Sequence, residues 1–234
     1  MRGWHDPAMG GSDATRLSLI QRAAQGAPED REEFAVTYGR VVRAYLLARW
    51  RASSMLSEVD DAVQEVLLTC LREGGALERF DPNRGGGFRP FLYGVVRNVA
   101  LHAERARARR QVREAHGADV EQLAEDGPGL STAFDRAWAE AMVREAAAHH
   151  RDLAVGRGPD AERRVELLRL RHSDGVPIRE IAVRWGEDAS RLHHQYALAR
   201  REFREALREV VAFHHPGTAE EVEERCQRIA GSLR

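Results

Sequence analysis

Apolar side chains recur at every third or fourth position along most of the chain, which is the spacing of one face of an α-helix. No segment shows the strict alternation of a half-buried strand, so we predict an all-α fold. The clearest helix follows Ser57, which is predicted to cap it with Asp60 as the capping-box partner. Seven apolar residues then share one face: Val59, Ala62, Val63, Val66, Leu67, Cys70 and Leu71.

Two long helices are predicted on either side of this one. Pro28 is suited to the first turn of a helix. The buried stripe expected after it is Phe34, Tyr38, Val41, Val42 and Tyr45. Residues 80–87 are rich in Pro, Asn and Gly and are predicted to form a loop. The helix expected over residues 88–110 has the apolar stripe Leu92, Val95, Val99, Ala103 and Ala106.

Near the C-terminal end the pattern indicates a helix-turn-helix. A short amphipathic helix follows Pro177, residues 186–188 form a three-residue turn with Gly, and Asp188 can cap the next helix. In a DNA-binding motif the first residues of that second helix read base edges in the major groove, and later ones meet phosphates. The exposed candidates are Ser190, Arg191, His193, His194, Arg200, Arg201 and Arg204. A helical hairpin with a solvated polar face is the alternative.

Charge is balanced over the whole chain but not along it. The chain has 36 basic and 37 acidic residues, and every basic residue is arginine. Residues 97–113 carry a net charge of +5, whereas residues 114–160 carry −6, which we interpret as an acidic linker with a helix over 131–150. A face of the basic helix suits phosphate contacts, although a solvated surface is the alternative. Its polar residues are Arg97, Asn98, His102, Arg105 and Arg109.

Several classes of protein are not expected from this sequence. No apolar run reaches the about 18 residues of a membrane span, and the start does not resemble a signal peptide. Two cysteines without a CxxC pair favour a reducing cytoplasm. The histidines come as adjacent doublets, which lack the i,i+4 spacing of helical metal ligands. We therefore expect no metal, no cofactor and no catalytic site, and hence no enzyme.

Three segments in the chain carry a family resemblance. Residues 60–67 read DDAVQEVL, residues 88–100 read FRPFLYGVVRNVA, and residues 178–186 read IREIAVRWG. The first two resemble conserved motifs of the second region of bacterial RNA polymerase sigma factors, in the extracytoplasmic-function branch. The third resembles the fourth-region motif of the same family. The order of the three segments along the chain is also that of the family.

The resemblance implies a role for each matching residue. The positions that grip the clamp helices of the largest polymerase subunit are Asp61, Gln64 and Glu65. The positions that contact the promoter-proximal element are Asn83, Arg84, Arg97, Asn98, His102, Arg105 and Arg109. Among them, Asn83 and Arg84 match the family's pocket for a flipped base. The positions at the distal element are Ser190, Arg191, His193, His194, Arg200, Arg201 and Arg204.

The expected organisation is two small helical domains, one like sigma region two and one like the region-four helix-turn-helix. The segments are a disordered 1–13, a first domain over 14–113, the linker over 114–160, a second domain over 161–212 and a tail over 213–234. The expected partners are core RNA polymerase and promoter DNA in the bacterial cytoplasm, with an anti-sigma factor as a further candidate and no membrane.

Two other functions stay open. A stand-alone helix-turn-helix regulator would bind duplex DNA as a dimer on a palindrome and would have no use for the Asp61 face. A sigma-like adaptor without promoter recognition is favoured by Glu187 and Pro177, which depart from the family's turn and capping residues.

Overall fold

The computed structural model describes residues 20, 23–81, 87–114, 128–215 and 217–233. Within these ranges every regular element is a helix, which confirms the predicted all-α fold. The first group comprises α2 (Pro28–Trp50), the 3₁₀ turn η1 (Ser54–Glu58), α3 (Val59–Leu71), η2 (Leu77–Arg79) and α4 (Phe88–Glu114). The second comprises α5 (Pro128–Arg157), α6 (Pro159–His172), α7 (Ile178–Trp185), α8 (Ala189–His214) and α9 (Ala219–Ser232).

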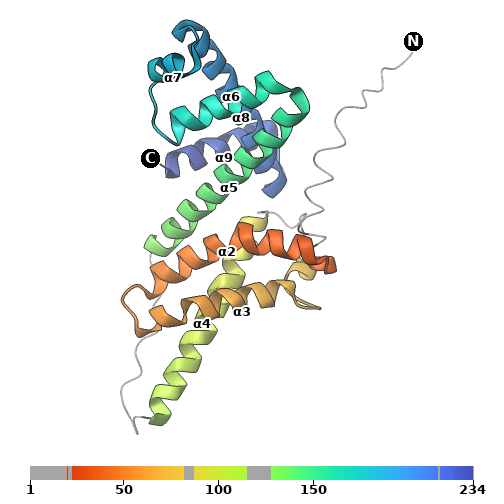
Figure 1. The fold of residues 1–234 in the computed structure, drawn as a ribbon. Coiled ribbons are helices and arrows are strands. Elements are labelled where there is room, and N and C mark those ends of the chain that lie inside the picture. The colour runs from red at the N-terminus through yellow and green to blue at the C-terminus, as the bar shows by residue number, and fades with distance from the viewer. Residues whose placement is uncertain (1–19, 21–22, 82–86, 115–127, 216, 234) are drawn as a thin grey trace, which may run out of the picture.

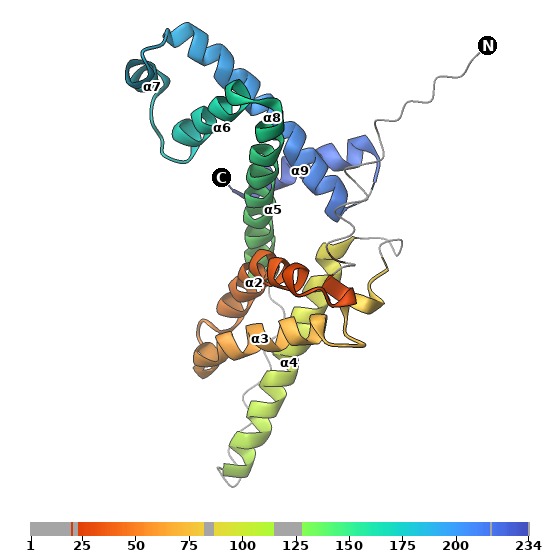
Figure 2. The ribbon, with the colours of Figure 1, turned by 45° about the vertical axis from the view of Figure 1, so that its right-hand side comes forward.

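Helix α5 is the element that connects the two groups. It packs along α2 at one end and against α6, α8 and α9 further along (Figure 1). Helices α2, α3 and α4 pack on one another, and the C-terminal half of α4 projects past α3 in both views (Figure 2). Helix α9 lies beside α5 and α8, where it buries Val222, Cys226 and Ile229.

A large apolar core runs through most of these helices. The stripe predicted for α2 is confirmed, because Phe34, Tyr38, Val41, Val42 and Tyr45 are all fully buried in it. Trp138 of α5 stacks on the Tyr38 ring, with 5.9 Å between ring centroids. The last turns of α8 and one face of α9 join the same core, so residues from 20 to 229 contribute to one apolar cluster.

A buried ion pair ties α2 to α4 inside this arrangement. Arg49 donates from Nε and Nη2 to the two carboxylate oxygens of Glu104, at 2.6 and 3.0 Å, and the Trp50 indole N–H donates to Glu104 at 2.8 Å. The Arg49 side chain is completely buried and that of Glu104 is 10 % exposed. Charged side chains can be buried in this way when they pair with each other and their hydrogen bonds are satisfied.

A second, smaller core lies between α6, α7 and the start of α8. Leu167 of α6, Ile178 and Ile181 of α7, and Leu192 of α8 meet there. Helix α7 ends at Gly186, which takes the left-handed conformation with φ 64°, and Asp188 caps α8 by accepting the Arg191 N–H at 2.9 Å. The predicted turn and its cap are therefore confirmed. Helix α8 contributes to both cores, with Leu192 near its start and Val210 near its end.

Four local predictions need correction. Ser57 does not cap α3, because η1 precedes that helix, and the side chain that caps η1 is Ser53. The buried line of α4 is Phe88, Leu92, Val96 and Ala100, with a spacing of four. Val95, Val99 and Ala103 lie beside this line and are only partly buried. The helix expected over residues 131–150 spans Pro128–Arg157, and residues expected to form a tail include α9.

Candidate nucleic-acid interface

One face of α4 presents the polar residues that the sequence singled out. Asn98, His102, Arg105 and Arg109 follow at helical spacing, and all four are exposed, as is Arg97. Because Val96 and Ala100 face the core, the adjacent polar positions point away from it. The structure therefore leaves this basic face open along the part of α4 that projects beyond α3.

The outer face of α3 presents a second group. Asp61, Gln64 and Glu65 are exposed, opposite the buried Val59, Ala62 and Val66. Leu68 follows Asp61 and Glu65 on the same face and is 60 % exposed. Sequence reasoning missed Leu68 because it considered only the buried stripe. The signal was available, since positions 61, 64, 65 and 68 follow the i, i+3, i+4, i+7 pattern of one helix face.

A groove of about 780 Å³ brings these two faces together. Asp61 and Glu65 of α3 line one side, and Asn98 and His102 of α4 line the other. Its apolar lining includes Ala62 of α3 and four partly buried positions of α4: Val95, Val99, Ala103 and Ala106. The carboxylates predicted to bind the polymerase and the polar α4 residues predicted to bind promoter DNA therefore line the same groove.

The segment before α4, predicted to be a loop, is described only at its ends. Asn83 and Arg84, predicted to hold a flipped base, lie outside the described residues. Gly87 has φ 74°, and a Cβ atom there would lie 2.6 Å from both the carbonyl oxygen of His214 and Nδ1 of His215. Glycine is thus required twice over where the start of α4 abuts the end of α8.

Aromatic residues near this loop pack against one another and the core. The Phe80 ring centroid lies 5.3 Å from that of Phe88 and 5.0 Å from that of Phe91. Phe88 is buried, and Phe80, Phe91 and Tyr93 pack partly buried on the large core. Their main contribution is therefore to core packing.

The candidate distal residues lie on α8. Ser190, His193, His194, Arg200, Arg201 and Arg204 are all exposed, and at about 100° per residue they form one stripe opposite the buried Leu192 and Ala199. Arg191 is also exposed, but it lies about a third of a turn from the middle of that stripe. It therefore lies on the flank of the helix, in the first turn.

The turn before α8 accommodates the residue that departs from the family pattern. Glu187 pairs with Arg163 of α6 at 2.6 Å, and the Arg163 guanidinium lies over the Trp185 ring at 4.6 Å from its centroid. This contact replaces apolar packing by a polar bridge between α6 and the turn. Pro177 is the N-cap residue of α7 and provides no side-chain cap.

Comparison with known protein families gives one match, in the part of the chain that contains α3 and most of α4. The family model of sigma-70 region 2 matches residues 34–110. This part of the chain is therefore similar to sigma-70 region 2, and residues 34–110 are called the region 2 domain below. No curated protein matches the chain. The region 2 domain contains α3 and all but the end of α4, so the groove and both of its walls belong to it. The match supports a function in promoter recognition of the sigma-factor type, which is proposed below.

Outside the region 2 domain, two of the histidine doublets face carboxylates. His149 lies 2.5 Å from Glu209, and His214 Nε2 lies 3.0 Å from Glu145 while its Nδ1 lies 3.2 Å from the Tyr38 hydroxyl. Among the described residues, no group of three or more His, Cys, Asp or Glu side chains is placed to hold a metal ion. None of the helices in the described ranges is long and apolar enough to cross a membrane.

Proposed function

We propose that the chain is a sigma factor of the extracytoplasmic-function type that works in the bacterial cytoplasm. In this proposal α3 binds the clamp helices of core RNA polymerase, α4 and the loop before it engage the promoter-proximal element, and the helix-turn-helix reads the distal element. The observation that carries the proposal is the region 2 match, together with the exposed Asp61, Gln64 and Glu65 within it. The decisive experiment is transcription with reconstituted core polymerase on a promoter library.

The polymerase contact is tested by changing the α3 face alone. Gln64→Ala combined with Glu65→Arg is expected to weaken binding to core polymerase at least about tenfold, because both side chains lie off the buried face and a charge is reversed. Binding is measured by fluorescence anisotropy with labelled protein, and circular dichroism checks the fold. Glu32→Arg on the exposed surface of α2 is the matched charge reversal and should bind like the wild type. Equal affinity of all three proteins would remove α3 from the interface.

The distal contact is tested with two arginines of α8. Arg191 lies in the first turn, where side chains reach base edges, so Arg191→Ala should relax the base preference at one position of the distal element by about 1–3 kcal/mol. Arg204 lies further along the exposed stripe, so Arg204→Ala should weaken all promoters alike and lower the salt slope by about 1. Sequence logos from the library distinguish the two variants. An unchanged logo for Arg191→Ala would exclude direct reading by that side chain.

A further inference from the structure

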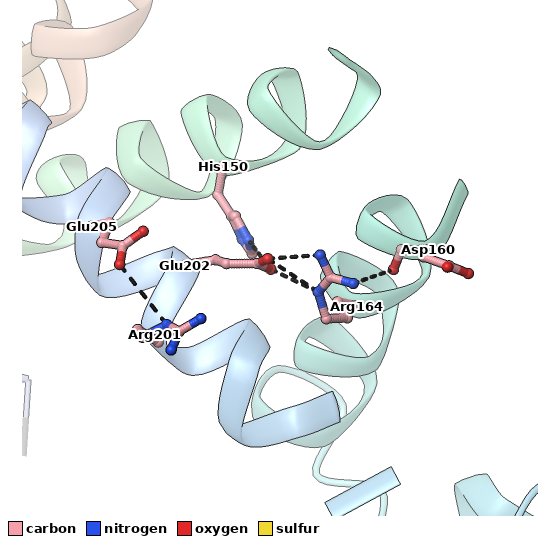
Figure 3. Close-up of polar contacts among 6 residues, drawn as sticks. All are labelled: His150, Asp160, Arg164, Arg201, Glu202 and Glu205. Atoms are coloured by element: carbon pink, nitrogen blue, oxygen red, sulfur yellow. Dashed lines mark hydrogen bonds and ion pairs between the residues drawn. The ribbon is translucent and has the colours of Figure 1, made fainter. Parts of the chain in front are cut away.

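Within the described part of the chain, three histidine–carboxylate pairs join α5 to α8. His149 faces Glu209, His150 faces Glu202, and in the opposite sense His214 of α8 faces Glu145 of α5. The middle pair differs from the others because a third helix takes part in it. Arg164 of α6 donates to the Glu202 carboxylate from Nε at 3.0 and 3.1 Å and from Nη2 at 2.7 Å (Figure 3).

We name His150, Arg164 and Glu202 the Glu202 hub. Their side chains are 4 %, 17 % and 13 % exposed, so the hub lies well inside the contact between α5, α6 and α8. The His150 Nε2 atom is 3.6 Å from Glu202, too far for a hydrogen bond, and it is buried without a hydrogen-bond partner. His150 therefore lies beside the hydrogen-bonded Arg164–Glu202 ion pair, and its Nε2 atom makes no hydrogen bond to it.

The hub lies directly behind the exposed stripe of α8. Glu202 follows Arg201 in sequence, and Arg201 points outward, where Glu205 lies 4.0 Å away (Figure 3). Adjacent residues on one helix move as a unit, so the contact that holds Glu202 to α6 also sets where Arg201 and its neighbours point. The ring of Phe203 lies edge-on to that of His150, with 6.1 Å between the ring centroids.

We propose that the Glu202 hub positions α8 for its contact with the distal promoter element, and that a proton on His150 loosens this hold. Glu202 is thus a positioning residue, and its effect on DNA rests on the function proposed above. The step is a simple protonation: solvent supplies a proton to Nε2 or Nδ1 of the imidazole, and no bond between heavy atoms changes.

The charges around His150 give the direction of the effect. Burial lowers the pKa of His150, Glu202 opposes this, and Arg157 of α5 and Arg164 of α6 lower the pKa further. Burial alone would raise the pKa of Glu202, but the Arg164 hydrogen bonds and the neighbouring positive charges bring it below its usual value. At neutral pH the hub therefore holds a charged carboxylate, a charged guanidinium and a neutral imidazole.

The sign of the pH dependence follows from the lowered pKa of His150. When the helices separate, the pKa of this imidazole returns to its ordinary value of about 6.5, whereas in the packed hub its pKa is lower. The contribution of the hub is therefore complete above about pH 6.5 and is lost as the pH falls towards the lower pKa of the packed state. Acid thus favours separation of α8 and α6 from α5.

Hydrogen exchange tests the protonation step on the full chain. In the wild type, opening at the facing segments of α5, α6 and α8 should increase between about pH 7.5 and pH 5.5, by up to about tenfold for each unit of pKa difference. Rates are corrected for intrinsic exchange. His150→Gln cannot take up a proton and should lose this increase. His172→Gln, at the exposed end of α6, is the control and should behave like the wild type. A His150→Gln protein with the full wild-type increase would overturn the proposal.

Transcription tests the positioning step. The readout is the ratio of transcripts from a promoter with an intact distal element to those from one with a scrambled element. Glu202→Gln should lower this ratio at least about threefold at neutral pH, because it leaves the Arg164 guanidinium without its counter-charge and weakens the contact between α8 and α6. Glu166→Gln is the control, since Glu166 likewise accepts from Nε and Nη2 of one arginine, Arg169, but within α6 alone. It should keep the wild-type ratio.

The outcomes separate this inference from the proposed function. If no promoter is transcribed with any variant, the sigma-factor function is wrong, while hydrogen exchange still decides whether His150 governs the hub. If transcription is normal and Glu202→Gln keeps the wild-type ratio, Glu202 does not position α8. The wild-type ratio should also fall at about pH 5.5, and His150→Gln should prevent that fall.

Discussion

At the scale of single residues, the buried charges show what sequence patterns leave out. Arg49 and Glu104 both appear in the sequence as ordinary charged positions on amphipathic helices, yet they form a buried pair 55 residues apart. Periodicity places a residue on a helix face but does not tell which distant residue will meet it. The same holds for Glu202 and Arg164, whereas the exposed faces of α3 and α4 followed from spacing alone.

Removing one partner of the Arg49 pair should therefore be costly. Arg49→Ala is expected to lower the free energy of unfolding by about 3–5 kcal/mol, because it leaves the Glu104 carboxylate buried without its counter-charge. Urea denaturation gives the value. Arg43, on the same helix as Arg49, pairs with Asp60 of α3, but these side chains are 48 % and 71 % exposed, so Arg43→Ala should cost at most about 1 kcal/mol. Equal losses in the two variants would contradict the buried-charge argument.

At the scale of elements, helix bodies were predictable and their ends less so. The core face of α2 and the start of α8 agree with the sequence analysis. The start of α3 does not, because Ser53 and Ser57 are both plausible caps by residue type and only the turn η1 decides between them. The fully buried line of α4 was displaced by one position, since the sequence could not reveal that its neighbours cover the side with Val96 and Ala100.

The two caps provide a direct comparison. Asp188→Ala should lower the free energy of unfolding by about 1 kcal/mol, since the carboxylate accepts the Arg191 N–H at the exposed start of α8. Ser57→Ala should change it by less than about 0.5 kcal/mol, because the Ser57 hydroxyl donates only a long, exposed bond of 3.4 Å to the Ser54 carbonyl oxygen. Thermal denaturation measures both. A larger loss for Ser57→Ala than for Asp188→Ala would restore the sequence-based cap.

At the scale of the whole molecule, α5 and α9 bring together segments that the sequence presents as separate. The acidic segment looked like a linker because its charge and its glycines dominate the local pattern. In the structure α5 packs along α2, and the last turns of α8 and one face of α9 share the large core with the region 2 domain. The division into domains at residues 113 and 161 stays a prediction, as do the roles of the site residues.

Trp138 is the residue through which this shared core can be tested. Its ring packs on Tyr38 of the region 2 domain and, edge-on, on His214 of α8 at 5.6 Å. Trp138→Ala is expected to cost about 3–5 kcal/mol and to reduce hydrogen-exchange protection in α2 and at the end of α8 together. Trp185→Ala, in the smaller core, should affect only α6, α7 and the start of α8. Loss of protection in α2 alone would mean that the two parts unfold independently.

One consequence follows from the fact that α8 begins in the small core and ends in the large one. A helix of 26 residues is a stiff rod about 39 Å long. Its C-terminal end packs beside α9 in the large core, and the exposed histidines and arginines lie towards its N-terminal end. A tilt of about 10° at the C-terminal end would displace the N-terminal end by about 7 Å, which is the rise of about two base pairs. On the proposed function, the number of base pairs between the two promoter elements would therefore depend on the angle of α8.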